Sequence, residues 1–370
     1  MHSLFPLIRR VRIVNLTYSG SMHPKDSIFQ FPPETLTNLL CEEFGQKTYV
    51  AKQVLDWVYD KGVYEFEKMS NLSKSIRTTL ASRFDCSLPE ITQELRSPRG
   101  ETLKLRLKLR DGREVESVFM KERKKATICL SSQVGCVQGC SFCATGKMGI
   151  IRNLSAAEMI AQVLVFKRRL ASSFPESVRL VFMGMGEPFH NLNQLFRALD
   201  TLTHSQGLGI GARKITVSTS GVVKGIFRLM EKKPQVQLAI SLHTVDQSLR
   251  NLWIPNQKET VGQILGAAKE FTEKTGRKIT FELVLFGGDH LKTAQINRLG
   301  KALKDIRCNI NAIPYNPIEG APQDFVRPTF EEIEKFRKIL SHWNQEVTVR
   351  ISKGRDIQAA CGQLIVTRAA

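Results

Sequence analysis

Three cysteines within eight residues form the most reactive group in the sequence. Cys136, Cys140 and Cys143 have the spacing CxxxCxxC, directly after an expected strand and with an aromatic residue before the last cysteine. Three thiolates on one tight loop can bind three corners of an iron–sulfur cubane, whereas fully ligated clusters take four cysteines. No fourth Cys or His lies in the loop, so one iron would keep an open position. The alternatives are a zinc site completed from elsewhere in the chain, or three unrelated thiols.

Polar residues follow several of the later expected strands. The segment GMGEP, which contains Gly186 and Glu187, comes after one of them, and others end in serine, histidine or asparagine. Chemistry in repeated βα units takes place at the C-terminal strand ends, so these residues are expected around one site. Taken alone, His243 could be a packed histidine, and Asn316 with Pro317 could form an ordinary turn.

The region from about residue 126 alternates strands with helices, which predicts an α/β fold with a parallel sheet or barrel. Capping boxes at Ser155–Glu158 and Thr329–Glu332 start two of the helices. The candidate strands are 126–131, 178–184, 214–218, 236–242, 278–285, 308–314 and 346–351.

Two other patterns precede this region. Residues 33–85 have helical spacing, whereas residues 103–110 alternate leucine with Lys or Arg and lead through Asp111 and Gly112 into a return strand. The basic face of this hairpin would suit RNA, although an exposed strand is often lysine-rich without a ligand. We expect a basic, disordered arm over 1–30, an accessory RNA-binding domain over 31–121, a catalytic core over 122–364 and a tail over 365–370, with the charged stretch 121–125 as the joint.

The chain has 370 residues and a net charge of +19, from 54 Lys plus Arg and 35 Asp plus Glu. This charge favours a polyanionic partner, most simply nucleic acid, although a solvated basic surface would give the same number. Eight cysteines in a long chain do not make a secreted disulfide scaffold. No apolar run approaches the ~20 residues of a membrane span. We therefore expect a cytoplasmic protein without a membrane partner, in which the basic clusters 121–125, 167–169 and 213–214 could contact phosphates or be ordinary surface clusters.

The first 25 residues contain no acidic residue, a composition that an organelle transit peptide also has. We favour a basic arm, or a translation start at Met22, over a transit peptide. Removal of residues 1–21 is therefore expected to leave activity intact.

Several segments together carry a resemblance to a known family. They are TICLSSQVGC at 127–136, GMGEP at 184–188, STSG at 218–221, SLH at 241–243, IPYNP at 313–317 and DIQAACGQL at 356–364. From about Thr35 to Leu364 the chain resembles the RlmN/Cfr family of radical S-adenosylmethionine (SAM) adenosine methyltransferases, and it is most similar to the RlmN, adenine-C2 type. The resemblance implies a radical SAM partial (β/α) barrel with a small accessory domain of helices and a β-hairpin, one [4Fe-4S] cluster on the three cysteines, and two SAM molecules per turnover. It places SAM contacts at Gly186, Glu187, Ser218, Ser241, Leu242, His243 and Asn316.

The resemblance also implies a reaction that uses two further thiols. C2 of adenine has no lone pair to attack a methyl donor, so the family first moves the methyl group onto a cysteine, here Cys361, as S-methylcysteine. A 5′-deoxyadenosyl radical from a second SAM then activates that methyl group for addition to C2. Cys129 matches the thiol that releases the product through a transient disulfide with Cys361. Glu116 matches the proton acceptor, although Cys129 could take the proton and Glu116 could be a solvated charge on an edge strand.

The substrates that the resemblance implies are an adenosine in the peptidyl-transferase loop of 23S rRNA and the adenosine 3′ of the anticodon in tRNA. We also expect a reducing partner such as flavodoxin and a monomeric enzyme. Two other functions stay open: C8 methylation of the same rRNA adenosine, as in Cfr, and a non-catalytic metal-bearing RNA-binding factor. The setting of Cys361 argues against the binding factor. Gln358 and Tyr315 depart from the family's frequent Asp and Trp, whereas Cys41, Cys86 and Cys308 match no functional position and are expected in the core.

Overall fold

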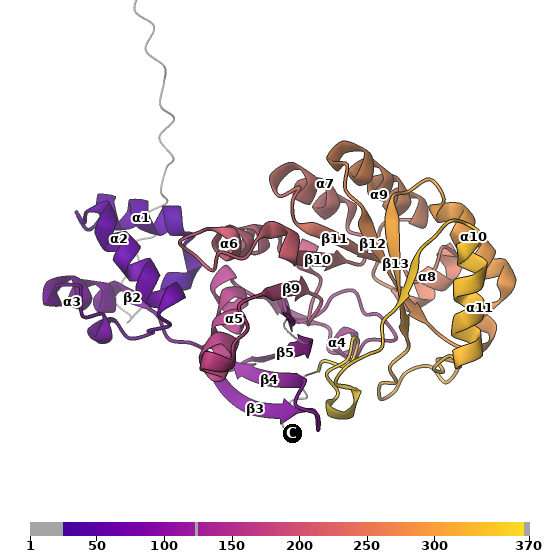
Figure 1. Ribbon diagram of the computed structural model, residues 1–370, viewed down its shortest axis with the longest axis horizontal. Coiled ribbons are helices and arrows are strands. Elements are labelled where there is room, and N and C mark those ends of the chain that lie inside the picture. The colour runs from indigo at the N-terminus through magenta and orange to yellow at the C-terminus, as the bar shows by residue number, and fades with distance from the viewer. Residues whose placement is uncertain (1–24, 123–124, 366–370) are drawn as a thin grey trace, which may run out of the picture.

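The computed structural model describes residues 25–122 and 125–365. Its centre is a ten-stranded sheet in the order β14-β13-β12-β11-β10-β9-β6-β5-β4-β3 (Figure 1). The strands are β3 Glu90–Arg96, β4 Thr102–Lys108, β5 Glu114–Glu122, β6 Lys125–Cys129, β9 Val178–Phe182, β10 Ile215–Thr219, β11 Gln237–Ser241, β12 Ile279–Leu285, β13 Cys308–Pro314 and β14 Val347–Val349. Each of the seven strands expected from residue 126 onward is present, with ends within two residues of the expected ones.

From β6 to β14 every neighbouring pair of strands is parallel, and the strands follow one another in chain order. Right-handed crossovers that all run in one direction put the connecting helices on the same face of the sheet, which leaves the other face for a site. Both expected capping boxes are present, at α5 and α11. Within the described ranges, no helix is long and apolar enough to cross a bilayer. The helices of this part are the short α4 Ala144–Lys147 and the longer α5 Ala156–Leu170, α6 Leu192–Thr203, α7 Val223–Lys232, α8 Gln247–Trp253, α9 Val261–Thr275, α10 Thr293–Leu303 and α11 Phe330–Ser341.

The hairpin strands are part of the same sheet as the core. β3, β4 and β5 pair in antiparallel fashion, and β5 pairs with β6 in the same way. β5 and β6 come from either side of the charged stretch 121–125, expected as a joint between domains, and they pair with Glu122 opposite Lys125. Backbone hydrogen bonds therefore cross the boundary that we expected at residue 121, and the buried residues of the helical part belong to the same hydrophobic core as the sheet.

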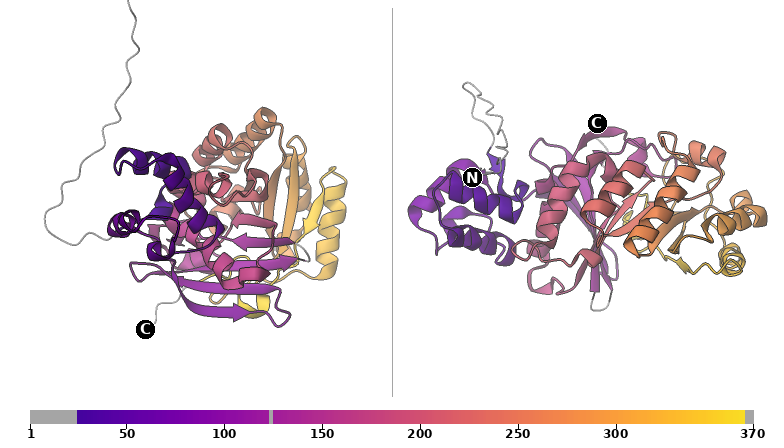
Figure 2. Two further views of the ribbon diagram at one scale, coloured as in Figure 1. Left: turned by 60° about the vertical axis from the view of Figure 1, so that its left-hand side comes forward. Right: turned by 90° about the horizontal axis from the view of Figure 1, so that it is seen from above.

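That helical part lies at one end of the molecule (Figures 1 and 2). It begins before the expected boundary at residue 31, because Ile28 and Phe29 are buried and the preceding strand β1 (Asp26–Ser27) pairs with β2 (Phe84–Asp85). Residues 1–24 of the expected arm and 366–370 of the expected tail lie outside the described residues. The main helices are α1 Pro33–Glu42, α2 Thr48–Leu55 and α3 Lys74–Arg83.

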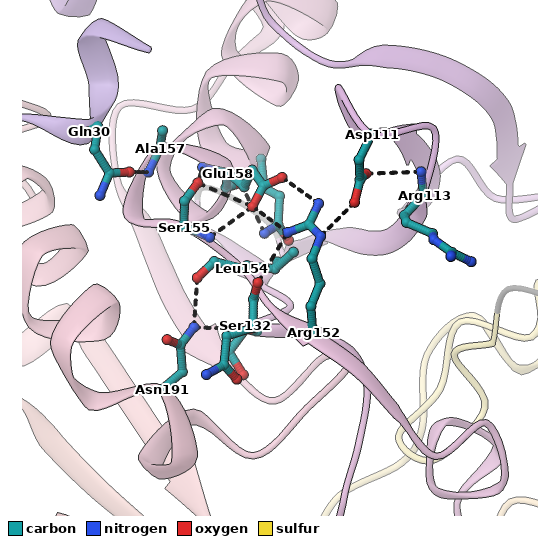
Figure 3. A network of polar contacts seen from close by, with 12 residues as sticks. Gln30, Asp111, Arg113, Ser132, Arg152, Leu154, Ser155, Ala157, Glu158 and Asn191 are labelled. Carbon is teal, nitrogen blue, oxygen red and sulfur yellow. Dashed lines mark hydrogen bonds and ion pairs between the residues drawn. The ribbon is translucent and has the colours of Figure 1, made fainter. Parts of the chain in front are cut away.

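A polar network joins the helical part, the hairpin and the start of α5 (Figure 3). Gln30 accepts the N–H of Ala157 at 3.3 Å. Arg152 donates Nε to Asp111 in the hairpin turn at 2.6 Å and both Nη atoms to Glu158 at 2.8 and 2.9 Å. Because Glu158 also closes the capping box of α5, this arginine fixes the hairpin turn against the core.

The basic cluster 167–169 contributes to the same docking. Lys167 Nζ donates to the carbonyls of Tyr59 and Asp60 in the helical part, the second at 3.1 Å. Arg169 makes two hydrogen bonds to Glu94 of β3, at 2.7 and 3.0 Å. These two cations, which could have contacted phosphates, are thus engaged within the protein.

Candidate active site

The cysteine loop is closed by two short strands. β7 (Gln133–Gly135) pairs with β8 (Ile150–Asn153), and the N–H of Cys136 donates to the carbonyl of Gly149 at 2.9 Å. All three thiols of the loop line one cavity with an empty volume of about 980 Å³. We call it the cysteine-loop cavity.

The thiols fit an iron–sulfur cluster by their chemistry. Burial raises the pKa of Cys136 to about 12 and also raises that of Cys140 and Cys143, so each thiol would release a proton on binding metal. In the described part of the chain, no three His, Cys, Asp or Glu side chains are grouped so as to hold a single metal ion. Thiolates are the donors that iron–sulfur clusters take, and three of them around one cavity suit ligation at three corners.

Glu187 and Gly186 lie on the wall of this cavity, after β9. The buried carboxylate of Glu187 accepts the N–H of Phe189 at 3.0 Å and of Ser220 at 2.7 Å, which ties the ends of β9 and β10 together. Burial raises the pKa of this carboxyl, and the two N–H donors oppose the shift. Gly186 has a φ of +104°, and a Cβ there would lie 2.5 Å from Gln133, so glycine is required.

The ends of β10 and β11 add two serines and a histidine. The hydroxyls of Ser218 and Ser241 lie 3.4 Å apart on the cavity wall. His243 also lines the cavity; its ring packs edge-on against Phe142, and its Nδ1 accepts the N–H of Val284 at 3.1 Å. Burial lowers the pKa of His243 to about 3, so the ring is neutral near pH 7. This histidine is therefore both packed and exposed to the cavity.

Asn316 and Leu242 complete the set of expected SAM contacts. Asn316 lines the cavity, and its Nδ2 donates to the carbonyl of Cys361 at 3.2 Å. Leu242 is fully buried and is not among the lining residues; its N–H donates to the carbonyl of Glu282. The structure thus brings six of the seven expected contacts to one cavity: Gly186, Glu187, Ser218, Ser241, His243 and Asn316.

Cys361 lies on the wall between two cavities. It lines the cysteine-loop cavity on one side and, on the other, a second cavity with an empty volume of about 1300 Å³. The N–H of Ala144 donates to the carbonyl of the next residue, Gly362, at 2.7 Å and so fixes the turn. The side chain opens into the cavities, but desolvation by the surrounding protein raises the pKa of the Cys361 thiol, and the positive charge of Arg350 opposes this.

The second cavity, which we call the Cys129 cavity, contains the other expected thiol and two cations. Cys129 lies at the end of β6, and Arg350 and Lys353 line the same space. Burial raises the pKa of Cys129 to about 12, and charge on Cys361 adds to the shift. Desolvation would lower the pKa of Arg350, but the negative charges of Cys361 and Glu282 outweigh it and raise that pKa. The two thiols expected to act together therefore share one cavity with the partly buried guanidinium of Arg350.

Glu116 is not among the residues that line either cavity. It is fully buried on β5, which runs between β4 and β6, so the alternative of a solvated charge on an edge strand is wrong. Its Oε1 lies 3.2 Å from Lys104 Nζ and 3.4 Å from Arg106 Nη2, and its Oε2 accepts the N–H of Ile365 at 3.1 Å. These two cations, expected on an RNA-facing side of the hairpin, instead contact a carboxylate. The role of Glu116 as a proton acceptor stays a prediction.

Of two charged residues that no motif indicated, Glu282 lines the cysteine-loop cavity and Arg250 lies behind its wall. Arg250 of α8 is 1% exposed and donates to the carbonyls of three residues at the ends of β10 and β11. Glu282 of β12 lines the cavity; its Oε1 accepts from Asn311 at 2.9 Å, and its Oε2 has no partner among the described residues. One signal in the sequence marked Glu282, because it is the only charged residue in the mostly apolar segment ITFELVL. No comparable signal marked Arg250, because the short segment around it, QSLRNLW, is mostly polar.

The remaining cysteines lie elsewhere. Cys86 and Cys308 are buried in the main core, as expected, whereas Cys41 is only partly buried, on α1. All eight cysteines are free thiols in the structure, so the transient disulfide stays a prediction.

Comparison with known proteins identifies the family. Residues 27–85 match the family described as Ribosomal RNA large subunit methyltransferase N-terminal domain, and residues 130–298 match the Radical SAM superfamily. A probable dual-specificity RNA methyltransferase RlmN of Bacillus velezensis is 39% identical over 339 residues, which cover 91% of this chain and 92% of that protein. This chain belongs to the RlmN family. The dual-specificity RNA methyltransferase RlmN of Lawsonia intracellularis is 42% identical over 341 residues, or 89% of this chain and 94% of that one.

A solved structure supports the radical SAM part of this assignment. A radical SAM methyltransferase from Sphaerobacter thermophilus superposes with a TM-score of 0.87 at 39% identity, covering 92% of this chain and 99% of that one. The expected radical SAM fold with an N-terminal accessory region is confirmed. As an RlmN family member the protein is a SAM-dependent RNA methyltransferase, so the alternative of a non-catalytic binding factor is wrong. Membership of the radical SAM superfamily implies a [4Fe-4S] cluster and SAM as cofactors.

Proposed function

We propose that this enzyme methylates C2 of an adenosine in 23S rRNA and of the adenosine 3′ of the anticodon in tRNA, with Cys361 as the methyl carrier. The observation that carries the proposal is the position of Cys361 between the cysteine-loop cavity and the Cys129 cavity. A thiol that receives a methyl group from one ligand and passes it to another has to reach both. The similar RlmN proteins are named dual-specificity RNA methyltransferases, which supports two kinds of RNA as substrates.

The cysteine-loop cavity would hold the cofactors. Cys136, Cys140 and Cys143 would bind the cluster, and the six strand-end residues on the same wall would bind SAM. When bound, these groups supply the methyl group and the one-electron chemistry that an unactivated aromatic carbon requires. The partly apolar wall, with Phe142 and Tyr315, would exclude water from the reacting atoms.

The Cys129 cavity would hold the target adenine. The Cys361 thiol would lose its proton and the thiolate would attack the methyl carbon of SAM, so that a carbon–sulfur bond forms as the bond from this carbon to the SAM sulfur breaks and S-adenosylhomocysteine leaves. This methyl group would give up one hydrogen atom to the 5′-deoxyadenosyl radical, and the carbon would then bond to C2. Glu116 or Cys129 would accept the C2 proton. The Cys129 thiolate would then attack the sulfur of Cys361, so that a disulfide forms as the carbon–sulfur bond breaks; the released carbon takes up a proton to become the new methyl group, and the surplus electron returns to the cluster. Arg350 lines this cavity and favours the anionic form of both thiols.

The partners follow from this chemistry. Bases read in RNA are mostly unpaired ones, so the adenine would be unstacked to enter the cavity. The accessory region 31–121 would bind RNA beside the core, and a small reducing protein such as flavodoxin would supply electrons. We further propose a monomeric enzyme of the cytoplasm.

Nucleoside mass spectrometry of RNA tests the proposal. Cells that lack the gene should lack 2-methyladenosine in 23S rRNA and in tRNA, and both should return with the cloned gene. Appearance of 8-methyladenosine instead would favour the Cfr-like reaction, and a change in rRNA alone would remove the tRNA part.

A further inference from the structure

A buried ion pair lies behind the segment that carries Cys361. Lys104 of β4 is 5% exposed and Glu116 of β5 is fully buried, with Lys104 Nζ 3.2 Å from Glu116 Oε1. Lysine and glutamate are rarely buried, and removing them from water is costly unless further hydrogen bonds satisfy them. What else these two side chains contact therefore indicates why they are inside.

Each member of the pair holds the backbone of the Cys361 segment. Lys104 Nζ donates to the carbonyl of Gln358 at 3.1 Å, three residues before the thiol. Glu116 Oε2 accepts the N–H of Ile365 at 3.1 Å, four residues after it. The pair thus holds the segment by hydrogen bonds on both sides of the reactive cysteine. Each of these contacts joins residues that are more than 240 positions apart in the sequence.

The opposite side of the segment is held by the cysteine loop. The N–H of Ala144 donates to Gly362, and Thr145 Oγ1 donates to the carbonyl of Leu364 at 2.6 Å. Gln358, which Lys104 contacts, has a φ of +50°, a conformation that is uncommon for a non-glycine residue and has to be held by its surroundings. The hairpin and the cysteine loop together fix the thiol between the two cavities.

We propose that Lys104 and Glu116 are positioning residues that set the place of the methyl-carrying thiol relative to both cavities. This inference rests on the proposed role of Cys361. It is separate from the proposed proton transfer to Glu116, because it needs no contact with RNA. It also gives the hairpin, which lies outside the matched radical SAM range 130–298, a task in the catalytic core.

Hydrogen–deuterium exchange of the cluster-loaded protein, read by mass spectrometry, tests the pair directly. Lys104→Met keeps the aliphatic stem and removes the ammonium group. Exchange of the peptide that spans 358–365 should become at least about 10-fold faster, since a protected amide and its neighbours lose their anchor. Lys108→Met is the matched control, because Lys108 lies on the same strand but is half-exposed and 3.9 Å from exposed Glu90; its exchange should match wild type.

Two further variants guard against simple misfolding. Ile365→Pro removes the N–H that Glu116 accepts and leaves the buried charges paired, so it should loosen the same peptide. Lys104→Arg keeps a donor and should restore part of the protection. Unchanged exchange at 358–365 in Lys104→Met, or faster exchange throughout the hairpin with Ile365→Pro at the wild-type value, would overturn the inference.

Kinetics separate positioning from general structure. Lys104→Met should lower kcat for RNA methylation about 10-fold or more, with KM for RNA within about twofold and iron content unchanged. A proportional rise in KM with unchanged kcat would contradict the inference. If Cys361→Ala still methylated RNA, the proposed function would fail, whereas the exchange result would still report whether the pair holds the segment.

Discussion

The two cavities that meet at Cys361 are built in different ways. The cysteine-loop cavity takes most of its wall from the loop after β7 and from β9 to β13 with the turns that follow them, so it repeats one βα design. The Cys129 cavity shares Cys143, Met183, Ile313 and Cys361 with it, but adds β5, β6, β14 and the segment that follows β14. The first cavity thus rests mainly on the repeated strands, whereas the second also needs the hairpin and a late segment. Substitutions on the two sides should therefore fail at different steps.

Cys136→Ala is expected to have the largest effect, because the loop has no spare thiol. Iron should fall from about four per chain to background, and methylation of both Cys361 and RNA should disappear. Iron assay and nucleoside mass spectrometry measure this. Cys41→Ala, in the helical part, is the control and should keep its iron. Iron retained in Cys136→Ala would assign the cluster elsewhere.

Substitutions of Cys361 and Cys129 should stop the reaction at successive points. Cys361→Ala should load iron yet form neither methylcysteine nor methylated RNA. Cys129→Ala should methylate Cys361 and attack the base, then stall with RNA bonded to the protein through denaturation and released from it by ribonuclease. Glu116→Ala should slow turnover without trapping this adduct, because the resolving thiol remains.

The assignment of the two thiols would be overturned by either of two results. One is RNA crosslinked to Cys361→Ala, and the other is normal turnover in Cys129→Ala.

Arg250→Met should affect the cysteine-loop side alone. Its guanidinium binds carbonyls at the ends of β10 and β11, so its loss should weaken SAM binding about 10-fold and lower the free energy of unfolding by roughly 2–3 kcal/mol. Calorimetry measures the affinity for SAM, and denaturant titration measures the free energy of unfolding. Arg228→Met removes an exposed ion pair with Glu231 on α7, and it should change neither the affinity for SAM nor the free energy of unfolding. A loss of RNA affinity with unchanged SAM binding would contradict the division between the cavities.

The smallest effect concerns acid stability. His243 has a folded-state pKa of about 3 against 6.5 unfolded, so the unfolded chain binds the proton more tightly. The contribution of the neutral ring to the free energy of unfolding is complete above pH 6.5 and is lost as pH falls towards 3. At pH 5 the free energy of unfolding should be lower by roughly 2 kcal/mol. His243→Asn keeps an acceptor for Val284 and should flatten this part of the stability–pH curve of the apoprotein. Identical curves for the two proteins would show that His243 is not the titrating group.

The sequence was most informative where chemistry is local. Cysteine spacing, the GMGEP turn and strand-end serines lie in short segments, so the cysteine-loop cavity could be outlined before its geometry was known. The strands of the parallel half were found for a similar reason, because buried strands read as apolar runs. Leu242 was placed among the contacts by resemblance alone; its side chain is buried, and its contact with SAM stays a prediction.

The hairpin shows where a pattern is insufficient. Alternation put Lys104 and Arg106 on a solvent face, since period two cannot distinguish a buried charge from a solvated one. Their partners, Glu116 and the Cys361 segment, lie on another strand and far along the chain. Likewise, the charge of 121–125 does not reveal that the strands on either side of it, β5 and β6, pair with each other.

The hydrogen bonds between the hairpin and the Cys361 segment can form only late in translation, after most of the chain has been made. Domains fold from the N-terminus as the ribosome delivers them, and the contact between Glu116 and Ile365 spans 249 positions. Hairpin, cysteine loop and most barrel strands are thus synthesised long before the segment that completes them. If Cys361 carries the methyl group as proposed, a nascent chain would have Cys136, Cys140 and Cys143 in place while it still lacked that thiol, and methyl transfer would be the last capability that synthesis confers.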